Sequence, residues 1–265
     1  MTDSPCPAFE QGLARLPEAL RALARPPATV IATQLAGLPV SAQGEKGLEA
    51  APRVLAVSEF VARACETRPE LLPDLIQSGD LFCAYASDEL HRRVQAAVAG
   101  CADESSLKTV LRRLRQREMV RIAWRDVAGW ANLEEVVRTL SALADACLDA
   151  ALAKLYDWAV AREGVPREQG TDTAARFVVL GMGKLGGEEL NFSSDIDLIF
   201  AYTEEGETDK RGLSNHEFFV RLGQRLNQAL NEQTADGFVF RVDMRLRPNG
   251  ASGPLALSFD AMEQY

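Results

Sequence analysis

The sequence predicts an α+β protein in which a helical bundle is followed by a mixed sheet with flanking helices. Residues 1 to about 163 are rich in Ala, Leu, Arg and Glu, and their apolar residues recur at helical spacing. Beyond residue 175, three short apolar runs have the composition or alternation of strands. A polar stretch with Gly and Pro, residues 162–175, separates these regions and predicts a linker. We therefore expect a helical domain over 1–168 and a second domain over 169–265.

The first region has the pattern of successive amphipathic helices. The predicted segments are 8–25, 53–66, 88–100 and 105–129, followed by a longer helix that starts after Asn132. Asn132 is a suitable N-cap, and Glu135 three residues later completes a capping-box pattern. From Leu133 to Leu155 the apolar residues of the longer helix form one stripe, as a helix buried along one face requires.

A strip of arginines stands out within the predicted helix 105–129. Arg113, Arg117, Arg121 and Arg125 recur every four residues, so they share one face of the helix. Such a face is usually solvated or paired with nearby acids such as Glu118 and Asp126. The alternative is that it docks onto the second domain or onto an acidic partner.

The second region predicts the order strand, glycine-rich turn, strand, helix, strand. The strands are expected within RFVVLGM (176–182), IDLIFAY (196–202) and FVFRVDMRL (238–246). The helix is expected over 214–232, where Ser214 and Glu217 form a second capping-box pattern. Its apolar face consists of Phe219, Leu222, Leu226 and Leu230.

Composition limits the classes of partner. The hydrophobic fraction of 47% is ample for a core, and the net charge of −9 provides no overall basic field for nucleic acid or an anionic membrane. No apolar stretch is long enough to span a bilayer, and the start MTDSPCPAFEQ lacks the pattern of a signal peptide. Five scattered cysteines without metal-like spacing indicate reduced thiols: Cys6, Cys65, Cys83, Cys101 and Cys147. We expect a soluble cytoplasmic protein that binds neither nucleic acid nor membranes.

The stretch GMGKLGGEELNFSSDIDLIF (181–200) matches GxGxxG after a strand, which raises the possibility of a dinucleotide site. A dinucleotide fold also needs a crossover helix before the next strand, and residues 187–194 leave room for about two turns at most. A Walker A loop is excluded, because Leu185 rather than Ser or Thr follows Lys184. The glycines therefore favour a phosphate-binding turn of another kind.

Two aspartates at the start of the second predicted strand are the candidate catalytic residues. Asp195 and Asp197 are two residues apart, so both side chains leave the same face of the strand. Two adjacent carboxylates are unfavourable without a cation between them, and Mg²⁺ prefers such oxygen ligands. Asp243, on the last predicted strand between Val242 and Met244, is the candidate third ligand. Metal ions held by this trio would activate an attacking oxygen and neutralise a leaving phosphate.

Residues around the trio are candidates for binding phosphate. Gly183, Gly186 and Gly187 would let backbone amides approach phosphate oxygens. Further contacts are expected from Lys184 and from the hydroxyl of Ser193 or Ser194, although Lys184 could equally be a solvated side chain. Arg245 and Arg247 share the face of Asp243 and would bind a phosphate tail, unless they form salt bridges instead.

These motifs resemble a known family. The glycine-rich turn, the D-x-D strand and the later acid are similar to the nucleotidyltransferase superfamily. More specifically, LGMGKLGGEELNFSSDIDLIFAY, FVFRVDMRLRPNGASGPL and RQREMVRIAWRDVAGWANLEEV resemble the bifunctional glutamine synthetase adenylyltransferase/adenylyl-removing enzyme family. Members carry two related nucleotidyltransferase halves and a regulatory region. The C-terminal half tends to read GYGKLGG with SDLDLVF, so Met182, Ile196 and Ile199 favour the N-terminal, adenylyl-removing half.

The resemblance implies a reaction that regulates nitrogen assimilation. Orthophosphate would remove AMP from a tyrosine of glutamine synthetase and release ADP, with magnesium on Asp195, Asp197 and Asp243. Phosphate or nucleotide would lie along residues 183–187, and the full-length enzyme would respond to a PII-type signalling protein. Because the chain ends at Tyr265, soon after the third acid, we expect a fragment. The alternatives are adenylyl transfer from ATP to glutamine synthetase or a small molecule, and a catalytically inert docking fragment.

Overall fold

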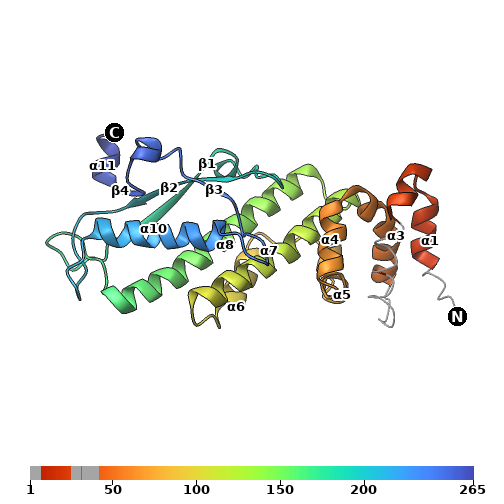
Figure 1. Cartoon of the computed structure of the whole chain (residues 1–265), viewed down its shortest axis with the longest axis horizontal. Coiled ribbons are helices and arrows are strands. Elements are labelled where there is room, and N and C mark those ends of the chain that lie inside the picture. The colour runs from red at the N-terminus through yellow and green to blue at the C-terminus, as the bar shows by residue number, and fades with distance from the viewer. Residues whose placement is uncertain (1–6, 25–30, 32–41) are drawn as a thin grey trace. The chain divides into compact units, whose positions relative to one another are not determined.

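A computed structural model describes residues 7–24, 31 and 42–265 and confirms the α+β class (Figure 1). The helices before the sheet are α1 (Pro7–Ala14), a helical stretch over 18–24, α3 (Ala42–Val57), α4 (Glu59–Thr67), α5 (Leu71–Gln77), η1 (Asp80–Phe82), α6 (Glu89–Val98), α7 (Glu104–Val127) and α8 (Leu133–Glu163). The remaining elements are β1 (Phe177–Met182), α9 (Gly183–Gly186), β2 (Ile196–Tyr202), α10 (Asn215–Asn231), β3 (Val242–Asp243), η2 (Gly250–Ser252), β4 (Ala256–Ser258) and α11 (Phe259–Glu263).

The chain divides into two compact units. Unit 1 contains the described residues of 1–87 together with 116–139, and unit 2 contains 88–115 together with 140–265. The two longest helices, α7 and α8, contribute residues to both units. The predicted boundary at 168 lies within unit 2, and the division into domains 1–168 and 169–265 stays a prediction. None of the described helices is long and apolar enough to cross a membrane.

Two of the predicted helices are interrupted. Helix α1 ends at Ala14 and helical structure resumes at residue 18, just after Pro17, whose ring cannot continue a preceding helix. The predicted segment 53–66 is divided at Ser58, which follows α3 and precedes α4. The Ser58 hydroxyl accepts a hydrogen bond from the Val61 amide at 3.3 Å and thereby caps α4.

The predicted start of the longest helix is confirmed. The Glu135 amide donates to Asn132 Oδ1 at 2.8 Å, and α8 begins at Leu133. Its predicted apolar stripe is buried at Leu140, Leu143 and Leu155, each at most 1% exposed, whereas Leu133 at its start is 77% exposed. Four cysteines, Cys65, Cys83, Cys101 and Cys147, are free thiols, whereas Cys6 lies outside the described residues.

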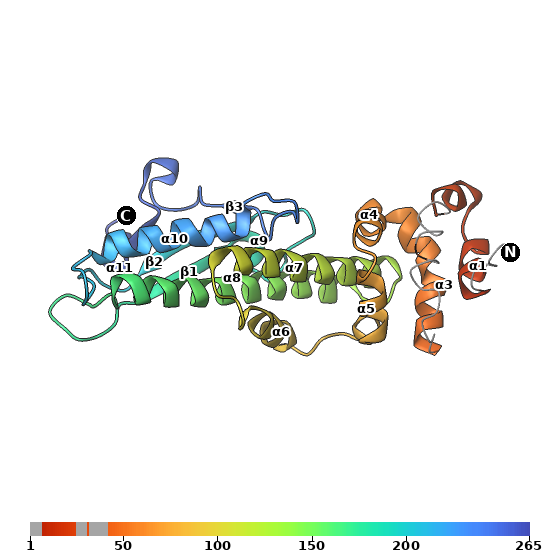
Figure 2. The ribbon, with the colours of Figure 1, turned by 60° about the horizontal axis from the view of Figure 1, so that its bottom comes forward.

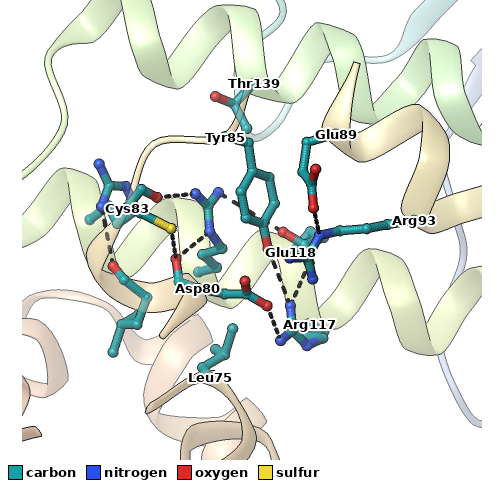
Figure 3. Close-up of polar contacts among 12 residues, drawn as sticks. Leu75, Asp80, Cys83, Tyr85, Glu89, Arg93, Arg117, Glu118 and Thr139 are labelled. Atoms are coloured by element: carbon teal, nitrogen blue, oxygen red, sulfur yellow. Dashed lines mark hydrogen bonds and ion pairs between the residues drawn. The ribbon is translucent and has the colours of Figure 1, made fainter. Parts of the chain in front are cut away.

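The arginine strip on α7 does not form a solvated face in unit 1. Arg121 and Arg125 are only 1% and 4% exposed. Arg121 donates from Nε to the Asp80 carbonyl at 2.8 Å and also donates to the Cys83 carbonyl. Its guanidinium lies 3.4 Å from the centre of the Tyr85 ring, a cation–π contact. Figure 3 shows Asp80, Cys83 and Tyr85 of the segment after α5 beside Arg117 and Glu118 of α7.

Carboxylates complete this buried network. Arg117 donates to Asp74, Asp80 and Glu118 at distances of 2.6, 2.6 and 2.7 Å. Glu118 is 2% exposed; burial raises the pKa of its carboxyl, against the opposing effect of Arg117 and Arg121. The expected pairing of the strip with Glu118 is therefore confirmed for Arg117. In unit 1, the arginines tie α7 to the segment 74–85 rather than facing solvent.

The sheet of unit 2 is mixed. Strand β1 pairs antiparallel with β2 along its whole length, from Phe177 opposite Tyr202 to Met182 opposite Asp197. Both β3 and β4 pair parallel with β2, β3 at Ile196 and Asp197 and β4 from Phe200 to Tyr202. Since β1 already occupies one edge of β2, β3 and β4 share the other edge. The predicted third strand is therefore only two residues long, and β4 was missed.

Helix α10 covers one face of the sheet, and Figure 2 shows it running beside α8. The amide of Glu217 donates to the Ser214 hydroxyl at 3.2 Å, so the predicted cap is confirmed. Phe219 stacks on Phe177 and on Tyr202, with ring centres 5.5 and 5.1 Å apart. Side chains alternate along a strand, so this face carries the even-numbered residues of β2, and Asp197 lies on the opposite face.

The predicted linker has ordered structure. The Arg167 amide donates to the Glu207 carbonyl at 3.0 Å, and the Gln169 amide donates to the Glu205 carbonyl at 2.8 Å. Residues 167–172 and 205–207 line an open polar groove. These segments adjoin the start of β1 and the end of β2, whereas the candidate aspartates lie at the start of β2. The groove is therefore at the other end of the β1–β2 pair.

Candidate functional site

The glycine-rich turn forms the one-turn helix α9 directly after β1. Gly183 has φ +55°, and a Cβ there would lie 3.1 Å from Asp197 Oδ2. A Cβ on Gly186 would lie 2.5 Å from the Gly181 carbonyl oxygen, which is closer than real contacts allow. A Cβ on Gly187 would meet only ordinary contacts at 3.6 Å. Glycine is favoured at 183 by the positive φ and at 186 by the nearby Gly181 carbonyl, and Gly183 lies against the Asp197 carboxylate.

Sheet pairing brings two of the predicted aspartates together. Asp197 lies opposite Asp243 in the parallel β2–β3 pair, so both side chains leave the same face of adjacent strands. Asp195 is two residues before Asp197, just ahead of β2. The next residue, Ile196, is fully buried and its amide donates to the Arg241 carbonyl at 2.9 Å, which fixes the start of the strand. The three carboxylates therefore gather at one end of β2.

Arg241 is a site residue that the sequence reasoning missed. Its Nε donates to Asp195 Oδ1 at 2.5 Å, and its Nη2 donates to the Ser193 carbonyl at 2.6 Å. The alternation of Arg241, Asp243 and Arg245 along one predicted strand was the available signal, because residues two apart share a face. Arg241 links the residue before β3 to the loop that leads into β2.

Arg245 forms a bidentate pair with the third aspartate. Its Nε lies 2.8 and 3.0 Å from the two oxygens of Asp243, its Nη2 also donates to Oδ2, and its own amide donates to Oδ1 at 2.8 Å. These bonds lower the pKa of the Asp243 carboxyl. The pKa of Arg245 is raised by Asp243 first, and further by the negative charges of Asp197 and Asp195. The Arg245 guanidinium thus interacts electrostatically with all three carboxylates.

Lys184 and Ser194 are brought together as well. Lys184 Nζ donates to Ser194 Oγ at 3.3 Å, and Ser194 Oγ donates to Asn191 Oδ1 at 2.8 Å. Leu190 anchors the same loop, since its amide donates to the Ser141 hydroxyl of α8 at 3.1 Å. Lys184 therefore joins the glycine turn to the loop before Asp195, where an amine and a hydroxyl are available to an anion.

Unlike Arg241 and Arg245, Arg247 binds backbone carbonyls rather than an aspartate. Its Nη1 donates to the Met244 carbonyl at 2.7 Å, and its other nitrogens donate to the carbonyls of Gly253 and Ala251 at 3.3 and 3.2 Å. These bonds close the turn around η2. A phosphate would have to compete with three backbone carbonyls for this guanidinium, and a binding role for Arg247 stays a prediction.

Asp145 of α8, whose carboxyl is influenced by Glu188 of the loop after α9, predicts a dependence of stability on pH. Partial burial, together with the negative charges of Asp149 and Glu188, raises the pKa of Asp145 on α8 to about 6. Because the folded state binds this proton more tightly than the unfolded chain, stability should fall as pH rises from about 4 to about 6. Asp145→Asn should therefore raise the melting temperature more at pH 7 than at pH 4. Thermal scans at both pH values test this.

Asp157→Asn is the matched control for that prediction, because Asp157 is an exposed residue of the same helix. It should move the melting temperature little and equally at the two pH values. His91 belongs to the same surroundings, since its Nδ1 lies 3.6 Å from Asp149 Oδ2. A pH-independent gain from Asp145→Asn would contradict the assignment of the raised pKa.

The donor chemistry of the three aspartates suits magnesium, which prefers hard carboxylate oxygens. Asp195 and Asp243 are each held by an arginine, as described above. Within the described part of the chain, no three His, Cys, Asp or Glu residues are grouped as a ready metal site.

A family model described as glutamate-ammonia ligase adenylyltransferase matches residues 48–265. A bifunctional glutamine synthetase adenylyltransferase/adenylyl-removing enzyme of Nitrosococcus oceani is 55% identical over 214 residues, which is 80% of this chain and 22% of that protein. An enzyme of the same name from Pseudomonas aeruginosa is 48% identical over 261 residues, which is 96% of this chain and 27% of that protein. The chain thus spans about a quarter of the length of these relatives.

Proposed function

Because the chain belongs to the glutamate-ammonia ligase adenylyltransferase family, we propose that it is the adenylyl-removing part of a bifunctional enzyme acting on glutamine synthetase. The proposed reaction is phosphorolysis of the AMP ester on a tyrosine of glutamine synthetase, with release of ADP. It would take place in the cytoplasm, and a PII-type signalling protein would regulate the longer enzyme. The name of the relatives supports the substrate.

The observation that carries the proposal is the approach of the glycine turn to paired carboxylates. Asp197 lies against Gly183 and opposite Asp243, so a phosphate at the turn would meet both acids. Acids alone would repel a phosphate, and the amine of Lys184 and the guanidinium of Arg245 supply the compensating charge. This combination suits transfer of a phosphoryl-type group better than hydride transfer.

The proposed chemistry assigns a role to each group. Lys184 and Ser194 hold orthophosphate beside the glycine turn, with an oxygen directed at the α-phosphorus of the tyrosyl-AMP ester. That oxygen forms the new P–O bond as the bond to the tyrosine oxygen breaks, and the tyrosine takes up a proton. The products are ADP and unmodified tyrosine. Positioning and charge compensation account for most of the catalysis expected in such transfers.

Asp195, Asp197 and Asp243 are proposed to hold magnesium. When bound, the ion would neutralise charge on the phosphate oxygens and on the leaving tyrosine oxygen. The contribution of the chain is to fix the three carboxylates at the start of β2, through the β3 register and the Arg241 bond to Asp195.

The test uses adenylylated glutamine synthetase, magnesium and orthophosphate with the chain as it stands, and ADP is measured. ADP that appears only when both orthophosphate and the chain are present would support the proposal. The relatives' name also includes adenylyl transfer, so a parallel arm supplies ATP and unmodified glutamine synthetase. AMP incorporation without ADP release would favour the forward reaction, and neither product would favour a docking fragment.

Replacing Gly186 should displace the glycine turn and thereby lower the rate of ADP release. Gly186→Ala would place a methyl group 2.5 Å from the Gly181 carbonyl, so the turn must shift. A shift of about 1 Å in a positioning element costs up to about a hundredfold in rate. We expect ADP release to fall tenfold or more, measured as kcat/KM. Gly100→Ala is the control, because no described atom lies within 4 Å of its Cβ position. Equal rates for the two variants would contradict the prediction.

A further inference from the structure

The positive charge of Arg245 lies beside the three neighbouring carboxylates, whose mutual repulsion it reduces. It forms a forked pair with Asp243, and the carboxylates of Asp197 and Asp195 act on the same guanidinium. The two members of the pair differ in exposure, since the Asp243 side chain is 13% exposed and the Arg245 side chain is 82% exposed. The aspartate is therefore fixed by the sheet, whereas the arginine reaches it from solvent. An exposed side chain can turn away without breaking apolar packing.

We propose that Arg245 is a built-in competitor of magnesium: its guanidinium neutralises the carboxylates in the metal-free chain and leaves Asp243 when the metal binds. This inference rests on the proposed function, because it takes the three aspartates to be the metal ligands. A carboxylate that accepts a forked pair from arginine has the guanidinium in front of both oxygens, so a metal ion bound to the same oxygens would meet a like charge at close range. Once released, the guanidinium is free to bind an incoming phosphate.

Arg241 does not share this role. It binds Asp195 with one nitrogen and the Ser193 carbonyl with another, so it fastens the loop before β2 as well as an acid. Its side chain is 53% exposed, less than that of Arg245. Of the two arginines, Arg245 makes all its side-chain hydrogen bonds described here with Asp243 alone. Arg245 is thus the cation that a metal would displace.

The first experiment measures metal affinity without any substrate. Mn²⁺ is titrated into the wild-type chain, Arg245→Gln and Arg221→Gln at low ionic strength; the free ion is followed by electron paramagnetic resonance and then displaced with Mg²⁺. Arg221 is the control because it is half-exposed in unit 2 and pairs with Glu217 on its own helix. An exposed ion pair changes an equilibrium by up to about fivefold. We expect Arg245→Gln to bind about threefold more tightly or better, and Arg221→Gln to match the wild type.

The second experiment tests whether magnesium breaks the Arg245–Asp243 pair itself, rather than binding more tightly only because a positive charge was removed from the chain. The Nε–H signal of wild-type Arg245, assigned by its loss in Arg245→Gln, is followed by nuclear magnetic resonance during a Mg²⁺ titration. It should shift and exchange faster with water as the metal binds. A signal that stays unchanged while magnesium binds would overturn the proposal, because the pair with Asp243 would then persist. The proposal would also be overturned if Arg245→Gln bound Mn²⁺ no more tightly than the wild type, or if neither the wild type nor Arg245→Gln bound Mn²⁺.

These outcomes are separate from the test of the proposed reaction. Absence of ADP release, together with tighter Mn²⁺ binding by Arg245→Gln and a displaced Arg245 signal, would refute the reaction and leave the competitor in place. ADP release together with unchanged metal affinity in Arg245→Gln would refute the competitor and leave the reaction in place.

Discussion

Asp197→Asn is expected to lower ADP release from adenylylated glutamine synthetase by at least about a hundredfold, the scale on which charge stabilisation at a reacting centre is lost. The amide keeps the shape of the carboxylate but not its charge. Asp197 is the acid that lies against Gly183 and opposite Asp243, so a metal or phosphate held there would lose its central contact. Initial rates of ADP formation measure the effect.

The fold should survive this substitution. Removing one of three neighbouring negative charges relieves repulsion rather than breaking a support, so the melting temperature should stay the same or rise slightly. The control is Asp157→Asn, which removes an exposed carboxyl on α8 and should release ADP at the wild-type rate. Full activity in Asp197→Asn would remove Asp197 from the proposed mechanism.

Arg121→Ala is expected to destabilise unit 1 by about 3–5 kcal/mol, the usual cost of breaking a buried ion pair. The substitution removes the donors to the Asp80 and Cys83 carbonyls and the cation over Tyr85. It also removes a neighbour of Glu118, whose Oε2 lies 4.0 Å from Arg121 Nη1 and is among the described buried atoms that lack a hydrogen bond. Urea unfolding followed by fluorescence measures the loss, since Trp124 and Trp130 lie in unit 1.

Arg113→Ala provides the comparison within the same strip. Arg113 belongs to the same four-residue repeat, yet its side chain is 64% exposed and its nearest acid, Asp236, is 3.8 Å away. Its loss should change the free energy of unfolding by no more than about 0.5 kcal/mol. Similar costs for Arg113→Ala and Arg121→Ala would mean that burial of the network contributes little.

Periodicity and capping predicted the helices that carry the site. The patterns at Asn132 and Ser214 located the starts of α8 and α10, because a cap is a local interaction between residues three apart. The strands of 177–182 and 196–202 were also predicted, since their apolar runs are continuous. Strand β4 was missed because it is three residues long and is defined by pairing with a strand more than fifty residues away.

The relative placement of the three acids could be predicted from the sequence, and the partners of the arginines could not; the catalytic role of these residues stays a prediction. The spacing of Asp195 and Asp197 sets their shared face, and a hydrophobic-Asp-hydrophobic run marked Asp243. Partners of arginine are not local in sequence: Arg241 reaches Asp195 across 46 positions, whereas Arg247 turns to backbone carbonyls within six residues. The buried part of the arginine strip could not be foreseen for the same reason, because helical spacing gives a face but not what covers it.

The shared edge of β2 has a consequence for the local concentration of charge. Residues 244–255 leave β2 after β3 and return to it at β4, so both ends of this segment are fixed to one strand. A group on a short segment tethered in this way has an effective concentration on the order of millimolar at its target. Arg245 therefore stays close to the carboxylates even when it is unbound. A dissolved guanidinium salt would need a comparable concentration to take its place in Arg245→Gln.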